Sequence, residues 1–308
     1  MNKEIKKTLP TVTVALSAFN EETNIGNFIA SVLKQKEEGF ILEKILVVSD
    51  GSTDKTVEIV KSFDSPKLEF RDCKERTGKS IRLNEIYSEL NSDILVQSDA
   101  DIIFSHSFVI KDIIAPIVGN SEVGMCGGNP RPVEAVTFTE KAVNRTFEAY
   151  TSLRGNLRGG NNIFSADGRL LAYKKELAKK IFVPTDMIAN DAYTYFCCIT
   201  MGYKYKYVSS AVVLFRSPQN LKDQIRQNTR FLSAHIRMER YFPQEVVKRE
   251  WYIPKKIILI NMARQFFRHP ILSAYIFTVN KYCSFISVKK ERELNAKWDM
   301  AYTTKKPN

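Results

Sequence analysis

The chain has 308 residues, with 46 Lys or Arg against 34 Asp or Glu, so its formal charge is +12. A content of 44% apolar and 26% charged residues excludes disordered, collagen-like and disulfide-scaffold chains, and the length allows one large α/β domain or two smaller units. Five cysteines without metal-ligand spacing, and a start that reaches Pro10 without an apolar stretch, predict a reduced protein without a secretory signal, facing the cytosol.

Strand-like and helix-like segments alternate over the first hundred residues. Apolar runs predict strands at 12–17, 44–49, 68–71 and 92–98, and helical periodicity predicts helices at 24–36, 54–63 and 80–90. This alternation is typical of βαβ units and predicts an α/β fold with a mostly parallel sheet. Ligands bind beyond the carboxyl ends of the strands in such sheets, so polar residues that follow a strand are the first candidates for a site.

Polar clusters do follow three of the predicted strands. Asn20 and Glu21 come after the first strand, Asp50 after the second, and Asp99 and Asp101 after the fourth. Two carboxylates separated by one residue can both face a crevice and hold Mg²⁺ or Mn²⁺, because hard cations take oxygen ligands. Most such pairs are ordinary loop acids, and it is the position after a buried strand that favours a metal site here.

Two further patterns lie near these strand ends. Residues 50–54 read Asp-Gly-Ser-Thr-Asp, a plain strand-turn-helix cap that accounts for Ser52 and Asp54 but leaves Asp50 without a capping role. Residues 77–80 read Thr-Gly-Lys-Ser, but Cys73 stands where a Walker loop needs glycine, so an ATPase is rejected. Lys79 can still meet a phosphate or a base edge.

The later chain is less regular. Strands are predicted at 122–128 and 204–215, and helices at 191–201 and 221–240. Asp191 stands at a helix start, where its simplest role is a cap. Gln227 and Arg230 share a helix face at i, i+3, where a solvated turn is the simplest interpretation.

The charge is concentrated in the last third. Residues 1–215 hold 27 basic and 27 acidic side chains, whereas residues 216–308 hold 19 and 7. We therefore expect a catalytic unit at 1–215 and a C-terminal helical, basic amphipathic extension at 216–308 that favours an anionic surface.

The segment 257–269 shows this amphipathic pattern best. Polar residues recur on one helical face and apolar residues fill the other, and Pro270 should stop or kink the helix. The following apolar stretch, 271–288, is interrupted by Asn280 and Lys281, so no window long enough to span a membrane is expected. Two interpretations remain open, namely helices in a membrane interface and soluble packing against the body. The two faces consist of Asn261, Arg264, Gln265 and Arg268 against Leu259, Met262, Ala263, Phe266 and Phe267.

Together these motifs resemble those of the inverting family 2 glycosyltransferases of GT-A fold, over about residues 11–235. Five separate motifs stand in the order found in that family, and each of them is unspecific by itself. They are residues 17–21, residues 50–54 with Gly78-Lys79, Asp99-Ala-Asp101, Asn190-Asp191 and Gln227-x-x-Arg230-Phe231. The resemblance implies a Rossmann-like nucleotide-binding sheet flanked by helices.

The resemblance also implies roles for these residues. On the donor side, the first loop with Ala18, Asn20 and Glu21 would hold the nucleoside. Asp50 would bond the base, and Lys79 would lie near the base or diphosphate. Asp99 would touch the ribose and the metal, while Asp101 would ligate the Mn²⁺ or Mg²⁺ that bridges the diphosphate.

On the acceptor side, Asp191 would be the general base that takes the proton of the acceptor hydroxyl. Gln227 and Arg230 would steady the departing diphosphate, and Phe231 would lie beside the acceptor. The chain departs from the family pattern twice, with Asn190 in place of Glu and Phe231 in place of Trp. Phe231 can stack on a sugar but lacks an indole N–H donor.

The expected function is transfer of a sugar, with inversion, from a nucleotide sugar (a UDP-sugar by default) to a lipid-linked or growing cell-surface glycan. Such an enzyme would be non-processive and peripheral at the inner face of the cell membrane. A nucleotidyltransferase is one alternative, although the first loop lacks the glycines of that class. A catalytically inactive, membrane-tethered binding module is another. No nucleic-acid recognition motif is present.

Overall fold

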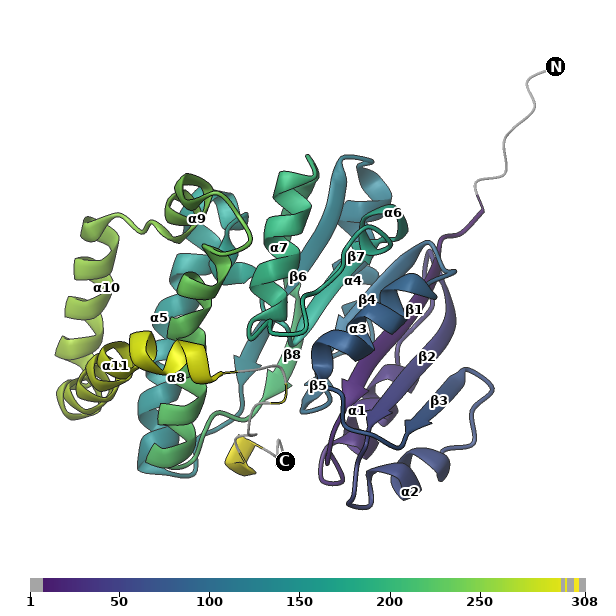
Figure 1. Ribbon diagram of the computed structural model, residues 1–308, viewed down its shortest axis with the longest axis horizontal. Coiled ribbons are helices and arrows are strands. Elements are labelled where there is room, and N and C mark those ends of the chain that lie inside the picture. The colour runs from purple at the N-terminus through teal and green to yellow at the C-terminus, as the bar shows by residue number, and fades with distance from the viewer. Residues whose placement is uncertain (1–7, 295–296, 298–301, 305–308) are drawn as a thin grey trace.

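The computed structural model describes residues 8–294, 297 and 302–304, and shows a curled sheet flanked by helices (Figure 1). Residues 1–7, on which the expectation about a secretory signal rests in part, lie outside the described residues. The strands are β1 (Thr11–Ala18), β2 (Ile41–Asp50), β3 (Leu68–Cys73), β4 (Ile94–Ser98), β5 (Ile102–Phe104), β6 (Val123–Pro132), β7 (Leu170–Lys174) and β8 (Lys204–Phe215).

Helices cover both faces of the sheet and form the C-terminal part of the described chain. In the first part they are α1 (Ile25–Leu33), α2 (Thr56–Lys61), α3 (Lys79–Ser88), α4 (Val109–Gly119), α5 (Phe138–Asn156), α6 (Lys175–Ala178) and α7 (Asn190–Thr200). They continue as α8 (Leu221–Met238), α9 (Gln244–Trp251), α10 (Lys255–Arg268) and α11 (Pro270–Lys290). Short 3₁₀ turns occupy Leu157–Gly160, Ile163–Ser165, Glu291–Glu293 and Tyr302–Thr304.

The strand order is β3-β2-β1-β4-β7-β6-β8-β5. The first four strands of this order run parallel, as predicted, whereas β7 pairs antiparallel with β4 and β6, and β5 pairs antiparallel with β8. Only residues 99–101 separate β4 from β5, yet β5 lies at the far edge of the order. The sheet must therefore curl so that its far edge returns to the carboxyl end of β4.

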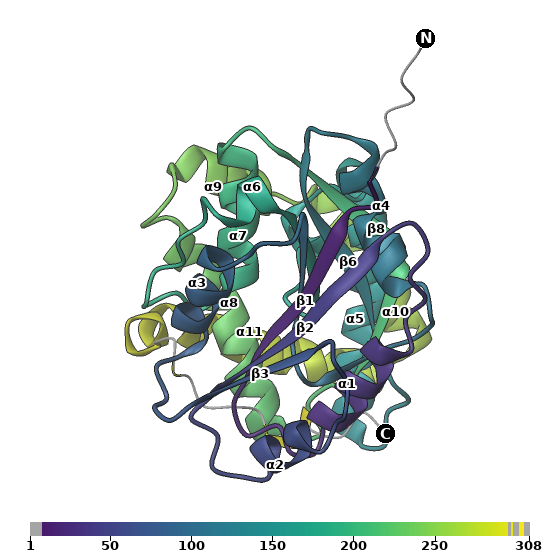
Figure 2. The ribbon, with the colours of Figure 1, turned by 90° about the vertical axis from the view of Figure 1, so that its right-hand side faces the viewer.

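Two hydrophobic cores lie on opposite faces of the sheet. Figure 2 shows α3 and α7 on one side of β1 and β2, and α1 and α4 on the other. Side chains along β1 point alternately to the two faces of the sheet. Val14 and Leu16 pack in the core with α1 and α4, and Ala15 packs in the core with α3 and α7. All of these strand residues are fully buried. The resulting three-layer scaffold fixes where each strand ends, and the site is built on those ends.

The sequence analysis missed β5, α4, α5, β7, α6 and α9. Helix α5 carried a usable signal, because the Thr137 hydroxyl accepts from the backbone N–H of Glu140 at 3.1 Å, and a Glu140 carboxylate oxygen accepts from the backbone N–H of Val136 at 2.8 Å. This Thr-x-x-Glu pattern is a capping box. The Glu140 carboxylate also pairs with Arg216 at 2.8 Å, within the protein interior.

Helix α11 corrects one expectation from the sequence. Asn280 and Lys281 do not interrupt it, because the Asn280 side chain accepts from the Asn228 amide of α8 at 2.8 Å inside a continuous helix. Residues 270–293 are thus long and apolar enough to cross a membrane by length and composition, with 22% of the apolar window buried. Pro270 ends α10 at Arg268 and begins α11, as predicted.

Candidate active site

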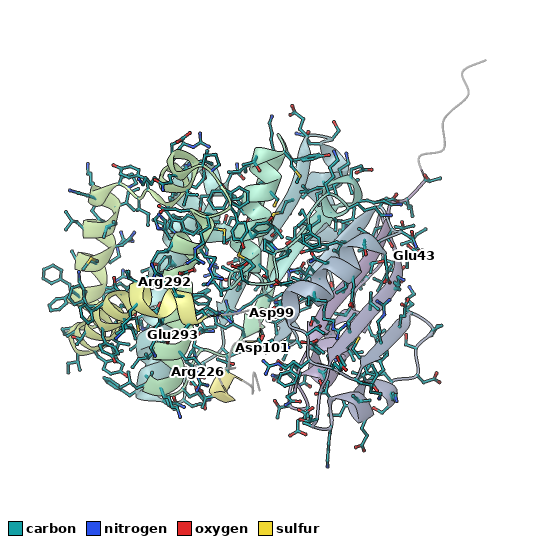
Figure 3. The ribbon with its side chains drawn as sticks, in the orientation of Figure 1. Glu43, Asp99, Asp101, Arg226, Arg292 and Glu293 are labelled. Carbon is teal, nitrogen blue, oxygen red and sulfur yellow. The ribbon has the colours of Figure 1, made fainter. Side chains whose placement is uncertain are left out.

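A cleft of about 1050 Å³ opens where β1, β2 and β4 end. One wall is formed by these strand ends and by the loop before β7. The other wall is formed by α8 and by five described residues of the C-terminal segment, namely Lys290, Glu293, Leu294, Lys297 and Thr304. In Figure 3, Asp99 and Asp101 lie on the strand side, and Arg226 and Glu293 lie across from them. Glu43, at the other end of the sheet, is far from both groups.

Most of the residues singled out from the sequence line this cleft. It brings together Asp99, Asp101 and Asp191, which the sequence separates by ninety positions, with α8 facing them. Ala18 and Asn20 are not on its wall: Ala18 is buried at the end of β1, and the Asn20 amide oxygen accepts from the Thr53 backbone N–H at 2.8 Å. The other predicted residues that line the cleft are Glu21, Asp50, Lys79, Gln227, Arg230 and Phe231.

Asp50 organises the turn that carries Lys79. Its two carboxylate oxygens accept from Thr77 through N–H at 2.9 Å and hydroxyl at 3.1 Å, from the Gly78 N–H at 2.8 Å and from the Arg82 guanidinium at 2.9 Å. A carboxylate offers about four lone-pair sites, so these donors fill it. A contact from Asp50 to a base would require one of them to give way.

Gly51 allows the same turn to close. It has φ +74°, and a Cβ at that position would lie 2.7 Å from the backbone nitrogen of Arg76. Only glycine fits both the left-handed backbone and this close approach. The loop that holds Lys79 is therefore fixed by residues 50 and 51 at the end of β2.

Asp99 and Asp101 face the cleft among cations. Lys79 forms an ion pair with Asp99. Burial opposes the charge of Arg169, but the Asp167 carboxylate, and then those of Asp101 and Asp99, raise the pKa of its guanidinium. The described residues contain no group of three or more acidic, His or Cys side chains placed to hold a metal. Two carboxylates fit a hard divalent cation that takes its other oxygens from a diphosphate and water. With such a cation bound, the Lys79 ammonium group would leave Asp99 and pair with a phosphate of the ligand.

Asp191, at the start of α7, is held and tuned by the loop before β7. Its carboxylate accepts from the backbone N–H of Ala192 at 2.8 Å and from that of Gly168 at 3.2 Å. Burial and then the neighbouring carboxylate of Asp167 raise the pKa of Asp191 above its ordinary value. A raised pKa makes a carboxylate a better proton acceptor near neutral pH, as a general base requires.

Asp167 stays ionised because two guanidinium groups hold it. Arg154 lies 2.9 Å and Arg169 3.1 Å from its carboxylate, and together they lower the pKa of Asp167 despite its burial. Arg169 also stacks on Phe215, with its guanidinium carbon 3.8 Å from the ring centroid. Negative charge is thereby kept next to Asp191.

Arg230 of α8 completes the inner part of the cleft. Burial lowers the pKa of its guanidinium, and the carboxylates of Asp191 and Asp99 partly offset that effect. The Phe231 ring lies 5.4 Å from the guanidinium carbon and is 47% exposed. The Arg230 guanidinium thus lies within the electrostatic influence of both Asp99 and Asp191.

The sequence analysis missed Asp167 and Arg169 for a topological reason. It looked for polar residues after strands, whereas these two precede β7. Because β7 runs antiparallel to β4, the beginning of β7 lies beside the carboxyl end of β4. A polar cluster before an antiparallel strand is the signal that would have found them.

The glycosyl transferase family 2 model matches residues 13–182, more than half of the chain. This chain belongs to glycosyl transferase family 2. The match ends before Asp191 and α8, so it covers the strand-side wall of the cleft and not the helical wall.

Curated relatives and a solved structure agree with this assignment. The chain is 23% identical over 286 residues to poly-beta-1,6-N-acetyl-D-glucosamine synthase of Staphylococcus epidermidis, covering 90% of this chain and 65% of that protein. It is 25% identical over 293 residues to the "Probable glycosyltransferase YdaM" of Bacillus subtilis, covering 90% and 68%. The chain thus spans about two thirds of these relatives.

A mannosyltransferase from Pyrobaculum calidifontis, solved with GDP-Man and Mn²⁺, superposes with a TM-score of 0.63 at 18% identity. The match covers 93% of this chain and 88% of that one. At that identity the likeness shows the shared GT-A fold.

Proposed function

We propose that this chain is an inverting, metal-dependent glycosyltransferase that moves a sugar from a nucleotide sugar to an acceptor hydroxyl at a membrane surface. We take a UDP-sugar as the donor, a lipid-linked or growing cell-surface glycan as the acceptor, and one sugar added per encounter. The observation that carries the proposal is the single cleft in which Asp99, Asp101, Asp191 and Arg230 meet.

The arrangement suits a displacement in which the acceptor oxygen attacks the anomeric carbon. Asp191 receives the hydroxyl proton as the new carbon–oxygen bond forms and the bond to the diphosphate breaks, and attack opposite the leaving group inverts the anomeric centre. Negative charge develops on the departing diphosphate, and Arg230, with Gln227 on the same helix face, stabilises it. Positioned general bases contribute roughly 10²–10⁴-fold to such reactions.

Asp101 and Asp99 are the residues that would hold Mn²⁺ or Mg²⁺. The cation would supply charge neutralisation of the diphosphate, as divalent ions do in phosphoryl and glycosyl-phosphate chemistry. Before a donor enters, Lys79 pairs with Asp99, and the buried Arg169 guanidinium lies within the electrostatic influence of both carboxylates.

A peripheral membrane contact is supported by helices α10 and α11. None of the residues of α10 is buried, and its apolar side is the more exposed one, with Leu259 at 66%, Phe266 at 53% and Phe267 at 86% exposure. Residues 252–290 contain seven Lys or Arg and no Asp or Glu. An outward apolar face with basic residues around it is typical of helices in an anionic membrane interface.

The packing of α11 favours lying along the membrane over crossing it. Ile276, Val279 and Cys283 are buried, and the Cys283 thiol lies 3.9 Å from the carbonyl oxygen of Ile225 on α8. Crossing the bilayer would strip this face from the body. The opposite side, with Phe277 and Phe285, remains exposed.

The donor assignment is tested by thermal unfolding with UDP-, GDP- and dTDP-sugars, with and without Mn²⁺. We expect one nucleotide class to raise the melting temperature in a Mn²⁺-dependent way, because a ligand that binds only the folded state stabilises it. Asp101→Ala should lose the Mn²⁺-dependent part, whereas Asp64→Asn, an exposed acid outside the cleft, should keep it. Donor stabilisation without transfer to any acceptor would favour the binding-module alternative.

The membrane assignment is tested by flotation with anionic vesicles. We expect flotation at low salt, release at high salt, and loss of flotation in the double variant Phe266→Ser, Phe267→Ser. Phe182→Ser is the matched control, because Phe182 is 69% exposed but lies outside α10 and α11. Absence of flotation at low salt would overturn peripheral attachment, and resistance to high salt would favour a spanning α11.

A further inference from the structure

The charged residues that line the cleft form two groups that differ in the balance of acidic and basic side chains. We call the part formed by the ends of β2 and β4, Lys79, the loop before β7, the start of α7 and Arg230 the inner cleft. The outer cleft is the part formed by the first half of α8, the loops after β1 and β3, and the described residues of the C-terminal segment. The inner cleft has Asp50, Asp99, Asp101, Asp167 and Asp191 with Lys79, Arg169 and Arg230. The outer cleft has Arg76, Lys222, Arg226, Lys290 and Lys297 with Glu21 and Glu293.

The inner cleft is close to neutral once its second layer is included. Arg82 pairs with both Asp50 and Glu85, and Arg154 pairs with Asp167, so five cations stand against six carboxylates. A divalent cation and the diphosphate of a nucleotide sugar carry equal and opposite charges. Donor binding therefore leaves the inner cleft close to neutral and does not draw on the positive charge of the outer cleft.

The outer cleft keeps its positive excess within the structure. The Arg226 guanidinium lies 3.6 Å from one oxygen of Asp223, and the other oxygen accepts from the backbone N–H of Thr303 at 2.9 Å and from its hydroxyl at 2.7 Å. Among the described residues, counting Asp223 with the two outer carboxylates still leaves five cations against three acids. An excess of this kind attracts an anion.

Lys222, Arg226 and Arg230 form a row along α8. They recur every four residues, so successive members lie about 6 Å apart on one face of the helix. Like charges at this spacing destabilise a helix, so the row does not stabilise α8. Figure 3 shows Arg226 facing the cleft from the wall opposite Asp99 and Asp101.

We propose that Lys222 and Arg226 form an acceptor subsite that binds a phosphate group, and that the acceptor is a glycosyl phosphate. This rests on the proposed glycosyltransferase function. Lys222 stands about 12 Å along α8 from Arg230, so a phosphate held by Lys222 would lie outside the inner cleft, in which Asp191 and Arg230 meet. Arg and Lys are the side chains that bind phosphate most strongly, Arg226 with paired N–H donors.

The test measures binding of three probes to the full chain saturated with Mn²⁺ and the nucleotide that stabilises it best. The probes are N-acetylglucosamine, N-acetylglucosamine 1-phosphate and a short-chain prenyl-diphosphate N-acetylglucosamine, titrated at low ionic strength. We expect both phosphate-bearing probes to bind at least about tenfold more tightly than the free sugar, from one or two charge-assisted hydrogen bonds. Tighter binding of the prenyl form assigns a lipid-linked source, and equal binding assigns a soluble sugar phosphate.

The double variant Lys222→Gln, Arg226→Gln should lose this preference while it keeps nucleotide-dependent thermal stabilisation. The double variant Lys180→Gln, Lys248→Gln removes the same two positive charges from exposed positions outside the cleft and should bind all probes as the wild type does. A preference that survives in the double variant of Lys222 and Arg226, or equal binding of all three probes, would overturn the subsite. Loss of nucleotide stabilisation in the wild type would instead refute the proposed donor site, so the two failures are distinguishable.

Discussion

The two walls of the cleft are built in opposite ways. On the strand side, carboxylates are locked by backbone donors and buried guanidinium groups, as Asp50 is by residues 77, 78 and 82. On the helical side, Lys222 and Phe231 of α8 are exposed, and Lys290, Glu293 and Lys297 of the C-terminal segment are exposed as well. The first wall is preorganised before a ligand arrives, and the second offers charge and an aromatic ring to whatever approaches from outside.

This contrast separates the two substrates. A preorganised polar wall stabilises developing charge without reorganisation at the moment of reaction, which suits the diphosphate and the proton transfer. An exposed wall on α8, the helix against which α11 packs, suits an acceptor that arrives with a membrane. We therefore expect substitutions on the strand wall to affect chemistry and stability, and substitutions on the helical wall to affect acceptor affinity.

The sharpest way to break this division is Asp191→Asn. We expect transfer to fall by at least about a hundredfold, because the amide cannot accept the hydroxyl proton. The melting temperature should stay within a few degrees of the wild type. The Asn amide oxygen can still accept from the backbone N–H of Ala192, and the substitution removes a buried carboxylate whose charged form is disfavoured by burial. Single-turnover transfer and thermal unfolding, measured on the same preparation, check both parts.

The donor-binding readout guards that experiment against a trivial explanation. If Asp191→Asn keeps Mn²⁺-dependent stabilisation by the nucleotide sugar, the lost transfer reflects missing base catalysis. Near-normal turnover would contradict the role of Asp191, and with it the assignment of chemistry to the strand wall.

Gly51→Ala tests whether the strand wall is as rigid as its contacts suggest. The new Cβ would lie 2.7 Å from the Arg76 backbone nitrogen, in a backbone with φ +74°. We expect a loss of roughly 2–4 kcal/mol in unfolding free energy, from left-handed strain and steric displacement together. Gly39→Ala is the matched control, because Gly39 has φ +80° but nothing within 4 Å of its Cβ position.

Chemical denaturation compares the two glycine variants. The control should lose only about 1 kcal/mol, which is the strain without the clash. Equal losses for the two variants would mean that the turn before Lys79 shifts easily, and the strand wall would then be no more rigid than a surface loop.

The two walls also differ in how far the sequence revealed them. Asp99, Asp101 and the turn at Asp50 were found because parallel strands place their carboxyl ends at one edge, a rule that needs only local pattern. Asp167 and Arg169 were missed because their place depends on β7 running antiparallel, which no local pattern shows. The contribution of Lys290, Glu293 and Leu294 was missed because it arises from the packing of α11 on α8.

Burial accounts for the error over α11. Lys281 and Asn280 look like interruptions in a linear hydropathy profile, yet Asn280 is satisfied by Asn228 across a helix interface. A polar residue that finds a partner on a neighbouring helix does not break a helix, and only the tertiary structure supplies that partner. The sequence predicted the helix α10, but only the structure shows that its apolar face is the more exposed one.

The smallest expected effect is a shift in pH dependence from Asp167→Asn. In the wild type, burial and the Asp167 carboxylate raise the pKa of Asp191. A general base is inactive once it is protonated, so a raised pKa places the acid limb of the activity profile at a higher pH. Removing the Asp167 charge lowers that pKa, so the acid limb of the kcat/KM profile should move to lower pH. The retained cations Arg154 and Arg169 act in the same direction.

The shift is measured from kcat/KM profiles of the variant and of Asp64→Asn, which removes an exposed carboxylate elsewhere and should leave the limb in place. A plateau rate near the wild-type value shows that Arg154 and Arg169 still hold the loop before β7. An acid limb that does not move under these conditions would mean that its titrating group is outside the influence of Asp167. Asp191 would then not be the base, because its carboxylate is bonded to the N–H of Gly168, the residue next to Asp167.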